Sequence, residues 1–390
     1  MITLNSADNV LKSVYLDVVA EQLNNNTNPL FSRIKQTTSD IYGKEIIKVA
    51  PYGINGGIGA GTETGTLPTP KGNNYVKFTT TLKNLYGTIE ISDKAIRSTE
   101  NDIGTFVNLL NSEMEGLLKA SKFNFSRMLY GNGTGKLATL TEEVDLDNVT
   151  IIVDSTKNLM EGMVVDIYSD ANVLTVQGAT ILSIDRANGR VLMDKNCSGV
   201  DEDYYLVVQG SKDLEITGLG AIISTSATLY GVTRSTNQFM NPIIKTSTSI
   251  KDSVIQEVID DLDEIYNSQV NFITCASNVK RFYLDYLAKI QRNVDIMDID
   301  SGIKAISYNG IPLVSDRFIK NGEMYLLNTN DFNVHQLCDW KWLESDSGKI
   351  LKQNNNTATY KATLVKYADL ICDKPCGQAK IKGITQAGTV

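Results

Sequence analysis

The sequence predicts an α+β fold in which one long helix lies against a sheet and a small β-barrel is inserted into the chain. Three observations lead to this prediction. Residues 101–130 repeat apolar side chains at spacings of three and four, the period of an amphipathic helix. Residues 43–88 contain two alternating segments around a glycine-rich centre. Residues 143–210 contain five or six short strand-like segments separated by turns.

Composition limits the classes of protein to which the chain can belong. Of its 390 residues 42% are hydrophobic, so the chain can form a core without disulfides or metals. No apolar run approaches the ~20 residues of a membrane span, and the first residues lack the pattern of a signal peptide. The net charge of −8 disfavours a protein whose main task is to bind phosphates. Five scattered cysteines indicate reduced thiols in a cytosolic protein.

Residues that carry catalysis do not form a coherent set. The single histidine, His335, excludes a histidine-rich metal site and lies in an alternating, strand-like segment, where we expect a structural role. Cys372 and Cys376 are separated by three residues rather than two, and no second ligand pair accompanies them, so we expect free thiols. We therefore predict no enzymatic activity, no catalytic residues, no metal and no cofactor.

Two further motifs resemble ligand sites but fail in detail. Residues 131–136 are rich in glycine and end in Lys136, yet Leu137 stands where a phosphate-binding loop needs Ser or Thr. The segment also follows a helix, so we predict a helix end running into a turn. Residues 298–302 begin like a calcium loop, but their glycine is one place early and no Glu occupies the twelfth position. We predict a polar turn there.

The N-terminal half divides into an arm, a hairpin and the long helix. Residues 1–42 form an arm with an amphipathic helix at 6–23, and residues 43–88 form a long hairpin with strands at 45–49 and 76–82. The hairpin tip carries Gly53, Gly56, Gly57, Gly59, Gly61 and Gly65. Two strands alone are marginal in water, so an extended hairpin indicates a partner surface. The core face of the helix consists of Phe106, Leu110, Met114, Leu117 and Phe125, with Met128 continuing the same spacing.

The middle of the chain predicts the inserted barrel. Its strands are expected at 149–153, 163–167, 173–176, 179–184, 190–193 and 204–208. Asn188 and Gly189 indicate a hairpin with a type I′ turn, in which both central residues have positive φ. Residues 211–248 are Ser/Thr-rich and mostly extended.

The C-terminal half reads as a compact sub-domain followed by returning strands. Within 249–342, Ser249 and Ser277 are expected to cap two helices, with strands at 272–275, 308–314 and 324–327. Trp340 and Trp342 lie on one face of a further strand. Residues 343–390 return to extended structure, and we expect strands 359–365 and 380–382 to pair with the sheet beside the long helix.

The order of these parts resembles the major capsid protein of tailed double-stranded-DNA bacteriophages, the Hong Kong 97 fold. Three segments carry the resemblance: the helix exit at 125–135, the turn at 214–219 with Gly218, and the strand at 309–315 with Pro312. Under this resemblance the ranges become the following: 1–42 N-terminal arm, 43–88 extended loop, 89–142 peripheral domain with its spine helix, 143–210 inserted β-barrel, 211–248 peripheral continuation, 249–342 axial domain and 343–390 peripheral return strands.

The resemblance implies a function and a set of partners. Copies of the chain would assemble, as pentamers and hexamers, into an icosahedral shell that encloses double-stranded DNA without reading its sequence. The shell would be part of the virion, assembled in the host cytoplasm with no membrane. It would have portal and decoration proteins as partners. No helical segment precedes the arm, so assembly would use a separate scaffolding protein or none. Lys71 or Lys77 could take the role of a crosslinking loop lysine, but no motif identifies its Asn partner.

Three alternatives remain open at this level. An encapsulin-like bacterial compartment shares the fold, although the inserted barrel makes it less fitting. A phage tail or adhesin protein would use its β segments to bind a surface, which the long helix after a glycine-rich hairpin disfavours. An enzyme on an α/β scaffold lacks a coherent acid, base, nucleophile or metal cluster.

Overall fold

The computed structural model describes residues 28–94, 103–144, 148–290, 296–298, 304–344 and 350–388. The helix expected at 6–23 lies outside these residues, as does the polar turn expected after Asp298. Within them the chain combines few helices with many strands, so the α+β prediction is confirmed.

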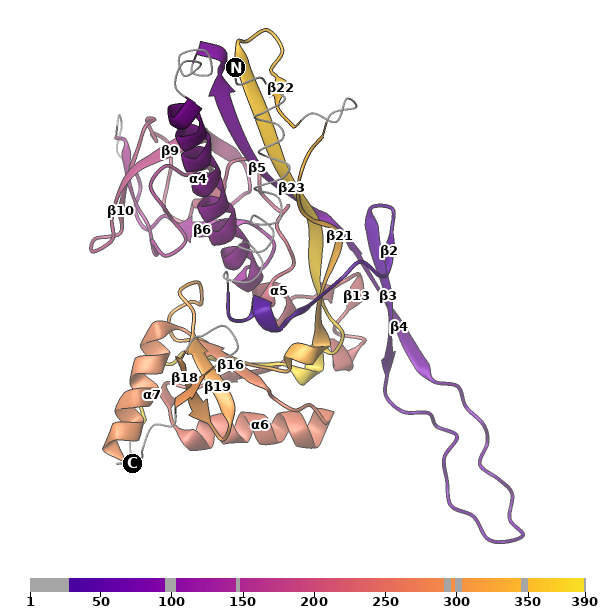
Figure 1. The fold of residues 1–390 in the computed structure, drawn as a ribbon. Coiled ribbons are helices and arrows are strands. Elements are labelled where there is room, and N and C mark those ends of the chain that lie inside the picture. Colours follow the sequence, from indigo (N-terminus) through magenta and orange to yellow (C-terminus); the bar gives the residue numbers. More distant parts are fainter. Residues whose placement is uncertain are drawn as a thin grey trace.

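The long helix is present as α4 (Ile103–Tyr130) and lies along a five-stranded sheet (Figure 1). This sheet contains β1 (Lys35–Thr37), β5 (Lys83–Ser92), β21 (Phe332–Trp342), β22 (Lys352–Gln353) and β23 (Thr359–Cys372). Strand β5 alternates strictly, with Leu85, Ile89 and Ile91 buried. Gly87 lies on that same face, where an added Cβ would come within 2.8 Å of Leu117 of α4. The missing side chain at Gly87 therefore lets the helix approach the sheet.

The hairpin is a separate three-stranded sheet that projects from the body of the molecule (Figure 1). It consists of β2 (Ile41–Tyr42), β3 (Glu45–Tyr52) and β4 (Asn74–Thr81), and β3 and β4 pair antiparallel from Glu45–Thr81 to Tyr52–Asn74. The two strands expected around a glycine-rich tip are thus present. The chain then re-enters the body, because β5, which begins at Lys83, pairs with β23.

The middle of the chain forms a six-stranded sheet with its own core, here called the insertion (residues 136–208). Its strands are β6 (Lys136–Thr139), β7 (Thr150–Ile152), β8 (Val164–Tyr168), β9 (Leu174–Asp185), β10 (Arg190–Met193) and β11 (Tyr205–Val208). They lie in the order β6-β11-β8-β9-β10-β7, and a bridge between Leu140 and Val153 joins the two outer strands. A sheet whose ends meet has no long open edge to pair with another chain.

The insertion differs from the sequence prediction in three details. It begins with β6 at Lys136, inside the range expected for the peripheral domain. The strands expected at 173–176 and 179–184 are one strand, β9, which passes through Gly178 at a positive φ. The β9–β10 hairpin exists, but its turn is not type I′, because only Gly189 has a positive φ. Asp185 instead accepts hydrogen bonds from the backbone N–H groups of Ala187 and Asn188, which fixes a longer loop.

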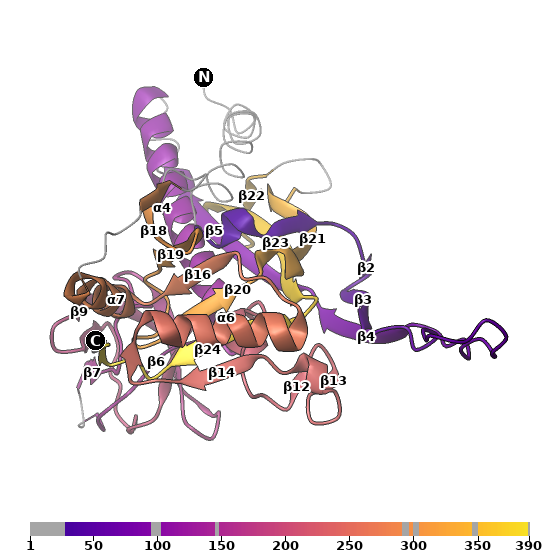
Figure 2. The ribbon, with the colours of Figure 1, turned by 90° about the horizontal axis from the view of Figure 1, so that it is seen from below.

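A seven-stranded sheet with two helices forms the remaining layer, here called the axial part (Figure 2). Its strands, in order, are β14 (Ile243–Thr246), β24 (Ala379–Lys382), β20 (Met324–Leu327), β16 (Phe272–Cys275), β19 (Ile311–Ser315), β18 (Lys304–Tyr308) and β17 (Ile296–Asp298). The helices are α6 (Asp252–Tyr266) and α7 (Ser277–Lys289). Buried Val258 and Leu262 of α6 and Val279 and Tyr283 of α7 belong to the main core.

Short elements complete the described chain. They are η1 (Phe31–Arg33), α5 (Leu219–Ile222), β12 (Thr228–Leu229), β13 (Val232–Thr233), η2 (Gln238–Met240), β15 (Ser249–Ile250), η3 (Thr329–Asp331), η4 (Pro375–Gly377) and β25 (Gln386–Ala387).

Two strands pair differently from the sequence expectation. Strand β21 was placed in the compact sub-domain at 249–342, but it pairs with β23 and β1 in the sheet beside α4. Strand β24 was expected beside the long helix, but it pairs with β14 and β20 in the axial part. The chain therefore crosses between the two sheets more often than its linear order indicates.

Three local predictions in the axial part were also wrong. Ser249 does not cap α6, because it is held in β15 by pairing with Gln386, and the N-cap position is Lys251. Ser277 is the first residue of α7 and not its cap, since Ala276 precedes it. The strand expected at 308–314 is a hairpin of β18 and β19, turning at Asn309 and Gly310. Both of these residues have positive φ, as a type I′ turn requires.

Candidate assembly surfaces

The hairpin has one face on the body and one face directed outward. Because side chains alternate along a strand, Ile46 and Ala50 of β3 share a face with Phe78 of β4, and all three are buried. At the far end of that face, Tyr52 stacks on Phe239 with ring centroids 4.3 Å apart. The hairpin is thus packed on its own subunit along its whole paired length.

The opposite face of the hairpin is left exposed by the part of the chain that the structure describes. Val49 of β3 is 58% exposed and Tyr75 of β4 is 59% exposed. Tyr42 of the adjoining β2 is exposed as well. Several large exposed apolar side chains on one face are typical of a surface that binds a partner.

Polar contacts fix the hairpin to β23 and to Asp373, the residue that follows this strand. Lys48 of β3 forms an ion pair with Asp373 at 2.7 Å. Thr80 of β4 donates to Asp369 Oδ2 at 2.8 Å, and Thr217 donates to Asp369 through its backbone N–H at 2.7 Å. Burial raises the pKa of the Asp369 carboxyl, and these donors oppose the rise. Asp369 thus joins three segments of the chain at the point where the hairpin leaves the body.

The glycine-rich tip lies between β3 and β4, and the structure places all six predicted glycines there. Gly53 follows β3 directly and has φ +66°, a conformation that favours glycine. Asn55 donates to Asn73 across the loop at 3.0 Å and accepts from Gly57 N–H at 2.8 Å. The tip also exposes large apolar side chains: Ile54 (74%), Ile58 (73%) and Leu67 (89%). The sequence analysis singled out the glycines and did not identify these three.

The predicted core face of α4 is partly described. Met114 and Phe125 are buried, and Leu117 is half-buried against the same core. Phe125 meets Phe31 edge-on with ring centroids 5.0 Å apart. The side chains of Phe106 and Leu110 lie outside the described residues.

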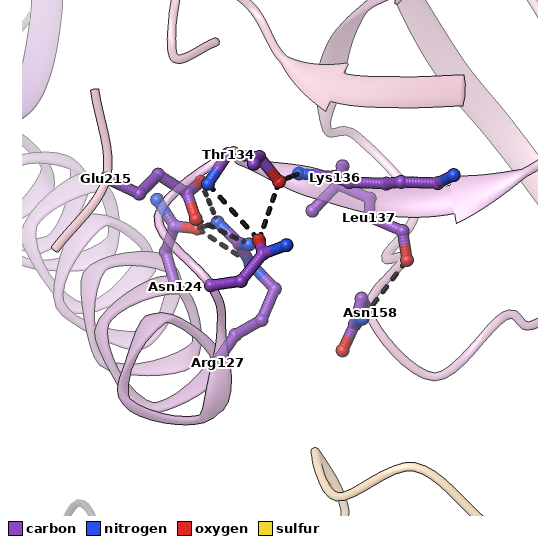
Figure 3. Close-up of polar contacts among 8 residues, drawn as sticks. Asn124, Arg127, Thr134, Lys136, Leu137, Asn158 and Glu215 are labelled. Carbon is purple, nitrogen blue, oxygen red and sulfur yellow. Dashed lines mark hydrogen bonds and ion pairs between the residues drawn. The ribbon is translucent and has the colours of Figure 1, made fainter. Parts of the chain in front are cut away.

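The C-terminal end of α4 holds a buried ion pair. Arg127 donates to Glu215 Oε2 at 2.9 Å and also to Glu215 Oε1, and both side chains are buried (Figure 3). Asn124, one helical turn earlier, accepts from Arg127 Nη2 at 2.6 Å. A guanidinium that faces a carboxylate with two parallel bonds is both strong and directional. This contact joins the helix before the insertion to the chain that follows it.

The entry and exit of the insertion lie side by side. The backbone N–H of Asp213 donates to the carbonyl of Thr134 at 3.0 Å. Gly133 and Gly135 have positive φ, and a Cβ on Gly135 would lie 2.9 Å from the Ser211 carbonyl oxygen. Residues 131–136 therefore form the tight turn that was predicted, in close contact with the returning chain.

A buried lysine links the sheet to the core of α4. Lys366 of β23 donates to Gln336 and to Asp339, each at 2.7 Å. Its ammonium lies 5.7 Å from the ring centroid of Phe125 and 5.8 Å from that of Trp340. Burial lowers the pKa of Lys366, and the Asp339 carboxylate opposes that shift.

The residues considered for catalysis take structural positions. His335 is buried in β21, and its Nδ1 donates to the Ser39 carbonyl at 2.9 Å. Cys372 and Cys376 are buried free thiols, and burial raises the pKa of both. In the part of the chain that the structure describes, no three His, Cys, Asp or Glu side chains gather as metal ligands. Its helices include none long and apolar enough to cross a membrane.

The sequence analysis also did not identify Asp369 and Asp373, the anchors of the hairpin. The available signal is weak: Asp369 is a carboxylate within an otherwise apolar run, Ala368 to Cys372. Such a position indicates a buried, hydrogen-bonded group, but it does not name the partner.

Known proteins resemble this chain in structure rather than in sequence. No protein-family model and no curated protein matches it. The chain is similar to a chain of the capsid asymmetric unit of cyanophage A-1(L), with a TM-score of 0.53 and 13% identity over 91% of each chain. Weaker similarity links it to the SrpI encapsulin of Synechococcus elongatus PCC 7942 (TM-score 0.47, 10% identity, 96% of this chain and 98% of that one). The capsid of Myoviridae phage XM1 is also similar (TM-score 0.46, 8% identity, 90% of each).

At this level of identity the first similarity shows the fold alone. The chain has the fold of that phage capsid chain across nearly its whole length. The resemblance to tailed-phage capsid proteins predicted from the sequence is therefore confirmed at the level of the fold.

Proposed function

We propose that this chain is the major capsid protein of a tailed double-stranded-DNA phage and that its copies assemble into a closed icosahedral shell. One observation carries the proposal: the hairpin projects from the subunit with exposed apolar side chains on its outer face and its tip, which the described residues do not cover. A neighbouring copy supplies the cover that such a surface needs. The capsid fold of the relative from cyanophage A-1(L) supports a shell over other repeated assemblies.

Each part of the chain has a role in this proposal. The hairpin acts as the extended loop that lies over a neighbour, and α4 acts as the spine of the peripheral domain. Residues 1–42 form the arm, the insertion is an added barrel domain, and the axial part meets its copies around the five- and six-fold axes. The contacts of Asp369 and Asp373 support the role given to the hairpin, because a projecting hairpin that binds a neighbour must be held firmly by its own subunit.

The proposed shell encloses DNA without recognising its sequence. The net charge of −8 supports an inner surface that does not adhere to packed DNA. A separate scaffolding protein, a portal and decoration proteins are the proposed partners, and assembly in the cytoplasm of a bacterial host is the proposed route into the virion. The protein has no enzymatic role in this proposal.

Electron microscopy of the purified protein, with its mass in solution, tests the proposal. Closed shells, or rings of five and six copies, are expected at high concentration or with a co-expressed scaffolding protein. A small fixed oligomer of another size, unchanged by either condition, would refute it. Particles recovered from infected cells should contain double-stranded DNA. Particles that hold protein cargo and no DNA would instead indicate an encapsulin-like compartment.

A further inference from the structure

An open groove lies between α4 and the insertion, and the residues that the structure describes leave it unfilled. The groove measures about 370 Å³, and Gly116, Ala120 and Phe123 of α4 form one wall. Met160, Met163 and Val164 of the insertion form the other wall. We call this feature the α4 groove.

The α4 groove is open because the helix presents small residues to it. A Cβ on Gly116 would meet nothing within 4 Å, and Ala120 next to it is exposed. Phe123 in the same wall is held in place, since its ring meets Phe318 edge-on with centroids 5.1 Å apart and the Arg317 guanidinium lies 5.0 Å from its centroid. The result is a fixed, mostly apolar hollow of the size that binds apolar groups.

The hairpin tip has the complementary chemistry. Leu67 is the most exposed of the large apolar side chains that the structure describes, and Ile54 and Ile58 of the same tip are also exposed. The tip carries one acidic residue, Glu63, and one basic residue, Lys71. The groove is likewise lined by one basic residue, Lys119, and one acidic residue, Glu161.

The tip of a subunit is directed away from that subunit's own groove. The insertion and α4 lie on one side of the molecule, and the hairpin projects from the other side in both views (Figures 1 and 2). The paired strands are also packed on the body as far as Tyr52, which fixes the direction of the hairpin. Only a second copy, placed head to tail with the first, can bring a tip to the groove.

We propose that the α4 groove receives the apolar hairpin tip of the neighbouring copy, with Leu67 as the inserted side chain. This inference rests on the proposed shell function and gives the insertion a role, because its loop at 160–164 supplies one wall of the socket. The contact is heterologous, with tip against groove, so it repeats around a ring and closes when the rotation between copies allows. The glycines beside Leu67 let one tip adapt to neighbours at slightly different angles.

A crosslinking experiment between two chains that each carry one engineered, exposed cysteine tests the contact. One chain carries Leu67→Cys and the other carries Ala120→Cys, both on a Cys338→Ser background because the other four cysteines are buried. The two chains are mixed, assembled and oxidised. The control pairs Leu67→Cys with Ile265→Cys, an exposed site on α6. We expect on the order of 100-fold more covalent dimer from the first pair than from the control, because the contact sets a high effective concentration.

A second variant tests the groove without changing the tip. Ala120→Trp fills the groove from an exposed position, so the unassembled subunit should unfold at the wild-type denaturant concentration while shells fail to form. Ala120→Ser should assemble normally. Shells that form with no Leu67–Ala120 crosslink, or Ala120→Trp shells like the wild type, would overturn the docking and leave the shell function standing. A wild-type chain that forms no shells or rings under any condition would overturn both.

Discussion

Gly218 lies against the end of α4 so closely that a single methyl group should destabilise the subunit. A Cβ at this position would lie 2.3 Å from the Met128 carbonyl oxygen, 2.6 Å from that of Gly131 and 2.7 Å from that of Leu129. Real Cβ contacts are essentially never below 3.0 Å, so the backbone must separate by at least about 0.7 Å. These oxygens belong to the backbone, which cannot rotate away as a side chain would.

The expected cost of Gly218→Ala follows from these contacts. Overpacking of this kind costs about 1–3 kcal/mol. Displacing the Gly131 carbonyl also strains its 3.0 Å hydrogen bond from Gly220, which is worth about 1 kcal/mol. Alanine also restricts the backbone of the unfolded chain, which stabilises the folded state by about 0.5 kcal/mol. The net destabilisation is about 1.5–3.5 kcal/mol.

Urea unfolding of the unassembled subunit measures this change. The chain has two tryptophans, and Trp340 and Trp342 are both buried in β21, so their fluorescence reports on the sheet beside α4. The matched control is Gly116→Ala. Gly116 is exposed within α4, and a Cβ added there would meet nothing within 4 Å. Alanine should stabilise the helix there by about 1 kcal/mol. A Gly218→Ala subunit as stable as the wild type, or an unfolding midpoint that shifts the same way in both variants, would refute the packing reasoning.

Three further predictions concern stability, pH and assembly. Glu215→Ala leaves the buried Arg127 guanidinium without its carboxylate and should cost about 3–5 kcal/mol in urea unfolding; a loss below 1 kcal/mol would contradict a buried pair. Burial raises the pKa of Asp331 to about 6, above the ~3.9 of an unfolded chain, so this group adds stability as the pH falls through 6 and loses it as the pH rises. Asp331→Asn should therefore unfold at higher urea than the wild type at pH 8, with a smaller difference at pH 5, and an equal difference at both values would exclude this origin. Val49→Asp, on the outer face of the hairpin, should leave the unfolding midpoint unchanged yet prevent shell formation, whereas Ile46→Asp on the inner face should unfold the subunit.

Local patterns predicted the elements whose causes are local. The spacing of Met114, Leu117 and Phe125 identified α4, because a helix repeats its buried face within a few residues. The alternation in β3 and β4 identified the hairpin for the same kind of reason. The turns show the limit of this approach. Asn188–Gly189 and Asn309–Gly310 are the same dipeptide, and only the second forms the type I′ turn.

Contacts between distant residues could not be predicted from one sequence. The pairing of β24 with β14 and β20 depends on which sheet the returning chain meets, and no pattern within Lys380–Lys382 encodes that choice. The pair of Arg127 and Glu215 spans 88 positions, and each residue alone is an ordinary surface type. The candidate surfaces were predicted only in outline. The glycines identified the tip from the sequence. The exposure of Leu67 and the groove beside Ala120 depend on how distant segments pack, so only the structure shows them.

The adjacency of Thr134 and Asp213 has a kinetic consequence. The six strands of the insertion pair with one another and enclose a core of their own, so this unit can form before the rest of the subunit. Once it has formed, the flexible chain between Arg127 and Glu215 shrinks from 88 residues to roughly 15, which lowers the entropy cost of closing that loop by about 1.5 kcal/mol. In refolding, the formed insertion would then hold α4 close to the chain that follows the insertion, which includes β21 and β23 of the sheet beside α4. A chain whose insertion is slow to form should be slow to acquire the buried environment of Trp340.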